Sequence, residues 1–342
     1  MEGRGLMVFL RVLLLRLATT AVTLIGVAVI VFAVIRVVPG NPIAMMLPPG
    51  ATPEDIAHLT ALYGLDKPLP AQFWIWAGGV LHGDFGTSIT TRQPVLGLVL
   101  GRLPATLELS VMALVIAIFL GGMAALIGTQ RRGTRVEGAI DVANGIALSV
   151  PDFLWGLVLM LGFGVLIPVF HISGRVTPSL DLPFATNFYL TESVVRLRFD
   201  LMADIAAHMF MPALALAIPL AAIIGQLLKQ SLKETMHLDY VTLARTKGYG
   251  ETHVILHEAL RNAVLPTLTL VGVQFTFLIG GTVIIERLFS YEGLGNMAID
   301  AVINRDLPLI QGIVILFAVI FTGVNLGVDL LYAVLNPRLR HA

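Results

Sequence analysis

The sequence predicts an all-α, polytopic membrane protein with six transmembrane helices. Three observations support this fold class. Hydrophobic residues make up 56% of the chain and charged residues 13%, against about 45–50% and about 25% in an ordinary soluble domain. The mean hydropathy is +0.87. Six apolar runs, each long enough to cross the hydrocarbon of a bilayer, alternate with polar or proline-containing segments.

The charge balance and the cysteine content limit the kinds of binding site and catalytic site that the chain can form. The formal net charge of +0 gives no indication of nucleic-acid binding, and there is no cysteine. Disulfides, thiolate metal sites and cysteine nucleophiles are therefore excluded.

The first predicted segment, residues 1–38, contains an N-terminal arm with three arginines and an uncharged run over residues 17–35. A cleaved signal peptide is the alternative interpretation. The run is longer than the apolar part of a signal peptide, and no small-x-small cleavage site follows it before Arg36. We therefore expect an uncleaved first span.

The second predicted segment, residues 39–103, lies outside the membrane. Thr52-Pro53-Glu54-Asp55 is typical of a helix start, with threonine as N-cap and proline in the first turn. A second helix is expected from Pro70 to His82, and its tryptophans suit a membrane interface. A small packing module is favoured here over a binding role.

The third predicted segment, residues 104–342, is a membrane core of five spans. They are expected over residues 109–130, 142–170, 209–228, 263–285 and 307–328, the second of these broken by Pro151-Asp152. Six spans place both termini on one side. More than half of the 22 Lys and Arg residues lie in the N-terminal arm, the turn after the second span, the loop over residues 229–262 and the C-terminal tail. By the positive-inside rule that side, with both termini, is cytoplasmic.

The loop over residues 229–262 is the longest polar, amphipathic stretch. Residues 242–247 are expected to form a short helix, which ends where Gly248 and Gly250 can adopt positive φ. Residues 251–262 are expected to form a second helix whose apolar face includes Val254 and Ala259. Such a helix–turn–helix suits a groove on a soluble partner. On periodicity alone, a loop that only connects two spans is an equal alternative.

No catalytic arrangement can be assembled from the sequence. There is no Gly-x-x-x-x-Gly-Lys-Ser/Thr motif to hold ATP phosphates, and no Ser/His/Asp set or intramembrane dyad. His253 and His257 have metal-ligand spacing, but a solvated or partner-facing pair is favoured over a metal site. We expect that the chain is not an enzyme and binds no cofactor or metal.

Among the acidic residues in or beside spans, two are candidates for a function. Asp152 follows Pro151 within the third span, and Glu286 follows the fifth. Carboxylates are costly in hydrocarbon, so such groups usually face an aqueous path or pair with a cation. Both are candidates for a translocation path. For Glu286, simple solvation at the span end beside Arg287 is a strong alternative.

The polar loop resembles the cytoplasmic EAA loop of ABC importer permeases. Ala244-x-x-Lys247-Gly248, then Ala259-Leu260-Arg261-Asn262 and Leu265-Pro266 carry the resemblance, with the spacing of the dipeptide, oligopeptide and nickel branch (the DppB/OppB type). Thr242 and Leu243 replace the first two residues of the EAA triplet. The resemblance implies an ATPase-coupling loop, to which we assign Ala244, Lys247, Gly248, Glu251, His257, Arg261 and Pro266.

Further segments resemble the first permease subunit of the same family. They are Pro39-Gly40-Asn41-Pro42, Gly64-Leu65-Asp66-Lys67-Pro68-Leu69, Gly83-Asp84-Phe85-Gly86-Thr87-Ser88, Ser149-x-Pro151-x-Phe153 and Gly293-Leu294-Gly295. Arg287 and Glu292 depart from the usual pattern, and Asp152 is not part of it. The resemblance covers nearly the whole chain, from Pro39 to Pro337.

The resemblance implies a binding-protein-dependent permease in a bacterial inner membrane, working by alternating access. It also implies four partners: a second homologous permease subunit, two ATPase subunits that bind ATP and Mg²⁺, and an extracytoplasmic solute-binding protein. A secondary transporter or channel acting alone is the alternative. The lack of a detectable internal repeat and the scarcity of intramembrane charges count against it. Dipeptides, oligopeptides, glutathione, opines and nickel are all compatible cargoes.

Overall fold

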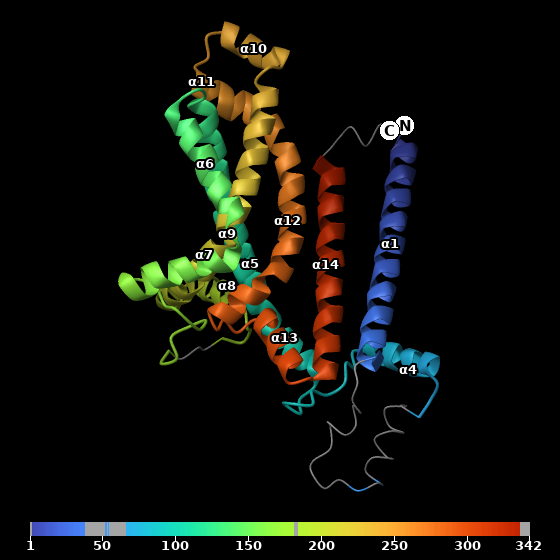
Figure 1. The fold of residues 1–342 in the computed structure, drawn as a ribbon. Coiled ribbons are helices and arrows are strands. Elements are labelled where there is room, and N and C mark those ends of the chain that lie inside the picture. Colours follow the sequence, from blue (N-terminus) through green and yellow to red (C-terminus); the bar gives the residue numbers. More distant parts are fainter. Residues whose placement is uncertain (1, 38–51, 53, 55–65, 181–183, 336–342) are drawn as a thin grey trace. The chain divides into compact units, whose positions relative to one another are not determined.

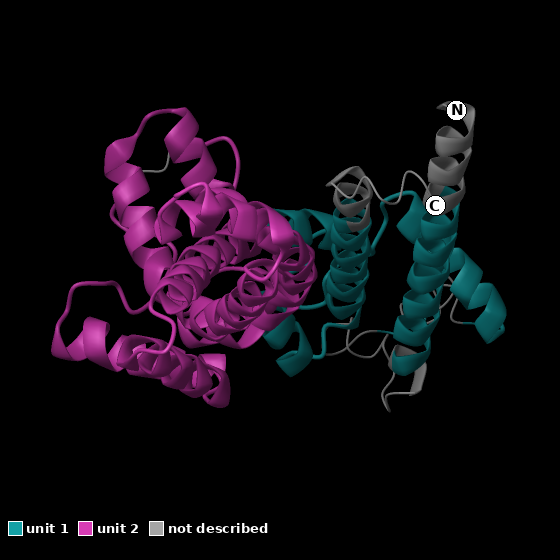
Figure 2. Cartoon of the chain, turned by 90° about the horizontal axis from the view of Figure 1, so that it is seen from above, with its two compact units in different colours: residues 1–103, 297–342 teal, residues 104–296 magenta. Residues whose placement is uncertain are grey.

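The computed structural model describes residues 2–37, 52, 54, 66–180 and 184–335. Within these ranges the protein is α-helical, with one isolated β-bridge between Thr87 and Pro94. Figure 1 shows the order of the helices. The chain divides into two compact units, residues 1–103 with 297–342, and residues 104–296 (Figure 2). Residues 297–342 thus group with the N-terminal segments and not with the rest of the predicted membrane core.

In the first unit, α1 (Glu2–Val37) packs against α14 (Leu307–Leu335) and against α4 (Leu69–Leu81). Phe32 of α1 meets Phe73 and Trp76 of α4, with ring centroids 5.4 and 5.8 Å apart. The helix predicted from Pro70 to His82 is confirmed as α4. The helix predicted to start at Thr52 lies almost wholly outside the described residues.

A buried carboxylate organises the segment between α4 and α5 (Val95–Gln130). Asp306, fully buried just before α14, accepts hydrogen bonds from the Ser88 hydroxyl (2.5 Å) and the Thr90 amide (3.0 Å). It also accepts one from the Leu309 amide in the first turn of α14. Because a buried carboxylate needs several donors, this one residue ties the turn before α5 to the start of α14.

The second unit is built around α9 (Phe199–Thr235), which contacts α6 (Arg135–Ser149), α7 (Asp152–Leu159), α8 (Tyr189–Val195) and α12 (Leu260–Leu288). In α9, 67% of the apolar window is buried, against 28% in α5 and 28% in the helix that includes α12. Met209, Met211 and Ile224 are among its fully buried side chains. The second unit is completed by η1 (Met160–Leu166), α10 (Asp239–Thr246), α11 (Glu251–His253), η2 (Val254–Ala259) and the start of α13 (Leu294–Ile303).

The predicted spans correspond to observed helices. Within the part of the chain that the structure describes, five helices are long and apolar enough to cross a membrane, or six if the bent pair of α6 with α7 and η1 counts as one span. The break predicted at Pro151 is confirmed, and the two halves meet at 104°. Proline at this position cannot donate a backbone hydrogen bond, so the helix ends before it and a new one begins after it.

Several helices extend well beyond the predicted spans. With 37 residues, α9 is about 55 Å long, whereas a bilayer core is about 30 Å thick. Part of the polar loop predicted from residue 229 is therefore a continuation of α9, which ends at Thr235.

Small residues allow α5 and α9 to pack closely. A Cβ atom added to Gly121 would overlap the Ala221 carbonyl oxygen, and one added to Gly225 would lie 3.0 Å from the Gly121 oxygen. Backbones can approach this closely only where both surfaces lack side chains. In contrast, a Cβ atom on the adjacent Gly122 meets no atom within 4 Å.

We therefore predict that Gly121→Leu separates α5 from α9 and destabilises the protein by at least about 3 kcal/mol, the upper range for overpacking. Thermal denaturation of the purified protein in detergent measures this. Gly122→Leu is the matched control and should denature within a few degrees of the native protein. Equal stability of the two variants would contradict the close packing.

Candidate functional site

The predicted loop folds into three short helical elements at the end of α9, namely α10, α11 and η2, which we call the lid. The apolar face of α10 is buried through Val241 and Ala244, which pack with Val254 of η2 and the partly buried Met236. This packing fixes α10 against the adjoining helices. Of the seven residues assigned to the coupling loop, Ala244 is the one whose side chain is buried; the other six are exposed.

The turn after α10 depends on one glycine. Gly248 has φ +87°, and a Cβ atom there would meet no atom within 4 Å. Positive φ is therefore the only obstacle to a side chain at this position. The prediction for Gly250 was wrong: it has φ −68° and ψ 152° and is the N-cap of α11.

Polar contacts close the loop. The Arg245 guanidinium forms an ion pair with Glu251 (2.9 Å) and donates a hydrogen bond to the Met236 carbonyl oxygen (3.3 Å). The Asn262 side-chain amide donates to the Tyr240 hydroxyl oxygen (2.6 Å). These bonds connect both ends of the turn to the helices on either side. Since they are exposed, each contributes little alone.

The second predicted helix does not end at Asn262. It runs from α11 through η2 directly into α12, and Pro266 lies inside α12. The predicted apolar face is confirmed, since Val254, Ile255 and Ala259 are buried. The turns of η2 are π-helical, and such turns within α-helices are frequent at functional sites. Consequently the loop and the fifth span are one continuous helical element.

The outward surface of this lid is partly apolar. Leu243 is 54% exposed, and Tyr240 and Tyr249 are also exposed. Tyr249, His253 and His257 form a stack, with ring centroids 4.6 and 4.4 Å apart. An exposed mixture of aliphatic and aromatic groups at one end of a membrane protein is suited to contact with another protein.

Beneath the lid is a hollow of about 650 Å³. Its lining includes basic residues from the turn after α5, from α9 and from α10, namely Arg132, Lys229, Lys233 and Arg245. Lys229 bridges Glu137 and Asp141 of α6, each at 2.8 Å. The hollow is therefore crossed by a charged link between α6 and α9.

At the other end of α9, Glu286 is fully buried in α12. It accepts hydrogen bonds from the Thr106 hydroxyl (2.7 Å) and the Asn296 amide (3.0 Å). Thr106 in turn accepts one from the Leu294 amide (2.8 Å). The alternative of a solvated Glu286 is therefore wrong, and Arg287 instead binds the Asn296 side chain (2.9 Å).

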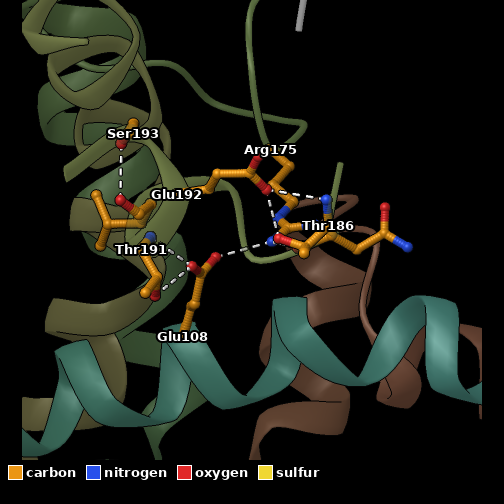
Figure 3. A network of polar contacts seen from close by, with 8 residues as sticks. Glu108, Arg175, Thr186, Thr191, Glu192 and Ser193 are labelled. Carbon is orange, nitrogen blue, oxygen red and sulfur yellow. Dashed lines mark hydrogen bonds and ion pairs between the residues drawn. The ribbon is translucent and has the colours of Figure 1, made fainter. Parts of the chain in front are cut away.

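A second buried carboxylate, Glu108 of α5, forms an ion pair with Arg175 (Figure 3). Their side chains are 5% and 6% exposed, and the N–O distance is 2.8 Å. The Thr191 amide and hydroxyl also donate to Glu108, at 2.8 and 3.0 Å, and the Arg175 guanidinium lies over the Tyr189 ring. This network connects the segment before α8 to a membrane-spanning helix.

The neighbouring turn is held by Glu192, also drawn in Figure 3. It accepts hydrogen bonds from the Thr186 hydroxyl (2.5 Å) and the Ala185 amide (2.9 Å), which lower the pKa of Glu192 to about 2. The carboxylate therefore remains charged over the physiological range.

The sequence does not reveal the pair of Glu108 and Arg175. The two residues are 67 positions apart, and no local periodicity connects them. The only signal was the charge of Glu108 beside an uncharged run.

Asp152 lies at the first position of α7, next to the break. It is half-buried, and its carboxylate accepts the Phe153 amide at 2.7 Å. An acid at a helix N-terminus is favoured by the helix dipole and by free backbone amides. Asp152 and Glu286 belong to different helices, and no hydrogen bond or ion pair between them is found among the described residues.

Comparison with known proteins identifies two matching sequence families. Residues 102–341 match the binding-protein-dependent transport system inner membrane component family, and residues 9–110 match the corresponding N-terminal family. Together the two matches cover most of the chain.

Individual relatives align over almost their full length. The dipeptide transport system permease protein DppB of Escherichia coli K12 is 38% identical over 97% of this chain and 99% of its own. The di/tripeptide permease DppB of Pseudomonas aeruginosa is 35% identical, covering 95% and 97%. The glutathione transport system permease GsiC of Salmonella choleraesuis is 35% identical, covering 97% and 99%.

The buried pair leads to a prediction. Arg175→Leu leaves the Glu108 carboxylate buried without its cation, which should lower the free energy of unfolding by about 3 kcal/mol or more. Denaturant unfolding of the purified protein measures the loss. The matched control is Arg196→Leu, because Arg196 pairs with Glu192 but is 43% exposed. Its effect should stay within about 1 kcal/mol, and a comparable loss in both variants would contradict the importance of burial.

Proposed function

The chain belongs to the family of binding-protein-dependent transport system inner membrane components, and from this premise we propose how it couples solute passage to ATP hydrolysis. It is a multi-pass membrane permease subunit of an ABC importer. The family is a membrane component and not itself an enzyme, and it works with ATPase and solute-binding partners. The alternative of a secondary transporter or channel acting alone is not supported.

The lid formed by α10, α11 and η2 is the proposed ATPase-docking element. The way the lid is packed supports this assignment: buried Val241 and Ala244 fix α10 in place, while Leu243 and Tyr249 remain exposed for a partner. Because α11, η2 and α12 are continuous, a displacement of the lid would move the fifth span. A helix in a partner's groove needs such a preformed, partly apolar face.

The remaining subunits follow from this scheme. We propose two ATPases, which bind ATP and Mg²⁺, a second homologous permease, and an extracytoplasmic solute-binding protein. In the proposed cycle, ATP binding closes the ATPase pair, the lid transmits the motion, and the spans open outward. This chain itself would bind no cofactor.

Small peptides are the proposed cargo class. The relatives are named for dipeptide, di/tripeptide and glutathione transport, and all three solutes have a peptide-like backbone. The aligned regions extend over almost the whole of each chain, which favours a related solute.

For the path, we propose that Asp152 is the acid nearer to the solute. It is half-buried beside the break between α6 and α7, where interrupted backbone is tolerated only against protein or an aqueous cavity. Glu286 is fully buried and bonded to Thr106 and the Asn296 amide. We propose that it supports the path without contacting the solute, by fixing the turn after α12.

The proposed orientation places the lid and both termini in the cytoplasm. Fusions of a reporter after Arg132 or Lys247 should therefore register as cytoplasmic, and fusions after His82 or Leu180 as extracytoplasmic. The physical reason is the retention of short basic segments on the cytoplasmic side. Paired alkaline phosphatase and fluorescent-protein fusions measure this, and the reverse pattern would refute both the orientation and the docking assignment.

The docking assignment is tested at Gly248. Gly248→Val places a β-branched side chain at positive φ, at a cost of about 1–2 kcal/mol, and should distort the lid without affecting membrane insertion. We expect weaker retention of the ATPase subunits and loss of solute-stimulated ATP hydrolysis in the purified complex.

Gly250→Val is the matched control, since Gly250 has φ −68° and accepts a side chain without strain. It should retain most of the native rate. If Gly248→Val hydrolyses ATP at the native, solute-stimulated rate, the lid is only a connector between spans.

A further inference from the structure

Two histidines and an aspartate meet in the second unit, far from the lid. His208 and Asp204 are on α9, one turn apart, and His171 lies in the segment between η1 and α8. One ligand atom from each residue lies within 4.8 Å of the others. The imidazole rings are stacked, with centroids 3.9 Å apart and planes at 6°. Residues 204–208 are near the start of α9, while the lid follows its end (Figure 1).

The aspartate is held in position from outside the cluster. The Thr177 amide donates to one oxygen of Asp204 (2.9 Å), and the Thr177 hydroxyl donates to the other (2.6 Å). A carboxylate oxygen accepts more than one bond, so each retains a lone pair for another partner. These contacts orient the carboxylate in the way that outer partners orient metal ligands.

The buried histidine is also oriented. His208 is 4% exposed, and its Nδ1 lies 2.9 Å from the Asp204 carbonyl oxygen. A carbonyl oxygen can only accept, so Nδ1 carries the proton in this bond, and Nε2 then carries a free lone pair. An imidazole with one nitrogen donating to a carbonyl is the usual form of a metal-binding histidine.

His171 is exposed, but its neighbours are anchored. Phe170 stacks on Phe210 of α9, with ring centroids 4.8 Å apart, and its amide donates to the Phe163 carbonyl oxygen (3.2 Å). On the other side, Ile172 lies so close to Gly164 that a Cβ atom there would overlap it. The segment therefore holds His171 over α9 while leaving its side chain free to adjust.

The cluster places one carboxylate beside two imidazoles. The ion-pair contact of Asp204 among the described residues is with the Nδ1–H of His208, at 3.5 Å. A divalent cation would balance the carboxylate and use both imidazoles in their neutral form.

We propose that His171, Asp204 and His208 form a binding site for a divalent transition metal of the Zn²⁺ class. Two imidazole nitrogens and one carboxylate oxygen are ligands that this ion accepts, with a fourth position for water or another group. Tetrahedral coordination places ligand atoms about 3.4 Å apart, so the widest separation in the cluster, at most 4.8 Å, shortens by up to about 1.4 Å on binding. A metal ion lies in the plane of each imidazole that binds it, so the His171 ring must also turn out of the stack. The exposed His171 side chain allows this movement, and the metal then ties the segment before α8 to α9.

Zinc binding to the full-length protein tests the site. The protein is purified in lipid nanodiscs with its co-purifying subunits, through a tag without histidine, and is stripped with a chelator. Isothermal titration with Zn²⁺ should show one site that His171→Ala and Asp204→Asn each weaken at least about tenfold. Cobalt titration should give a visible absorption band, which both variants lose.

His253→Ala with His257→Ala is the matched control, because these histidines are also stacked, at 4.4 Å and 14°, but form no such cluster with a carboxylate among the described residues. The double variant should keep the zinc affinity of the native protein. The proposal is overturned if the native protein binds no Zn²⁺, or if His171→Ala and Asp204→Asn bind as tightly as the native protein. It is equally overturned if only the control variant loses binding. His171 is exposed, so failure of a His208 variant to fold would not affect the test.

Discussion

The second unit depends on the burial of α9 among its neighbours. Lipid chains are as apolar as the side chains, so moving an apolar side chain from lipid to a neighbouring helix yields no hydrophobic free energy. Helix association in a bilayer therefore relies on close packing and polar contacts. The crossing of α5 and α9 at Gly121 and Gly225 provides the close packing, since neither surface has a side chain that would keep the backbones apart. The positions of α6, α7, α8 and α12 follow from their contacts with this helix.

Polar contacts complete the packing at the start of α9 and around the turn after α12. Glu108 and Arg175 neutralise each other below the surface, and Glu286 is satisfied by a hydroxyl and backbone amides. Buried charges of this kind add little net stability over apolar replacements, but removing one partner is costly. They therefore act chiefly to specify how the segments outside the spans attach to the helices.

The opposite end of α9 carries the lid, for which we propose a role in transmitting motion from the ATPases. Its lid is held by a small apolar cluster and exposed hydrogen bonds, which is weaker fixation than the core below it. Yet α11, η2 and α12 form one helical element. A lid that can shift as a unit and is continuous with a span satisfies the mechanical requirement of coupling, because helices transmit displacement along their axis.

The sequence by itself determined the helical class, the approximate spans, the break at Pro151, the positive φ of Gly248 and the family. These depend on composition, on local periodicity and on residues whose backbone preferences are intrinsic. The tertiary structure decided the rest. It placed Gly250 at a helix N-cap, continued the second loop helix past Asn262 within α12, and buried Glu286 where solvation was an alternative. It also brought Glu108 to Arg175 and His171 to Asp204 and His208. These outcomes depend on contacts between residues distant in the chain. Such contacts leave no periodic signal in the sequence, because they are selected by the packing of helices and not by the local conformation of either partner.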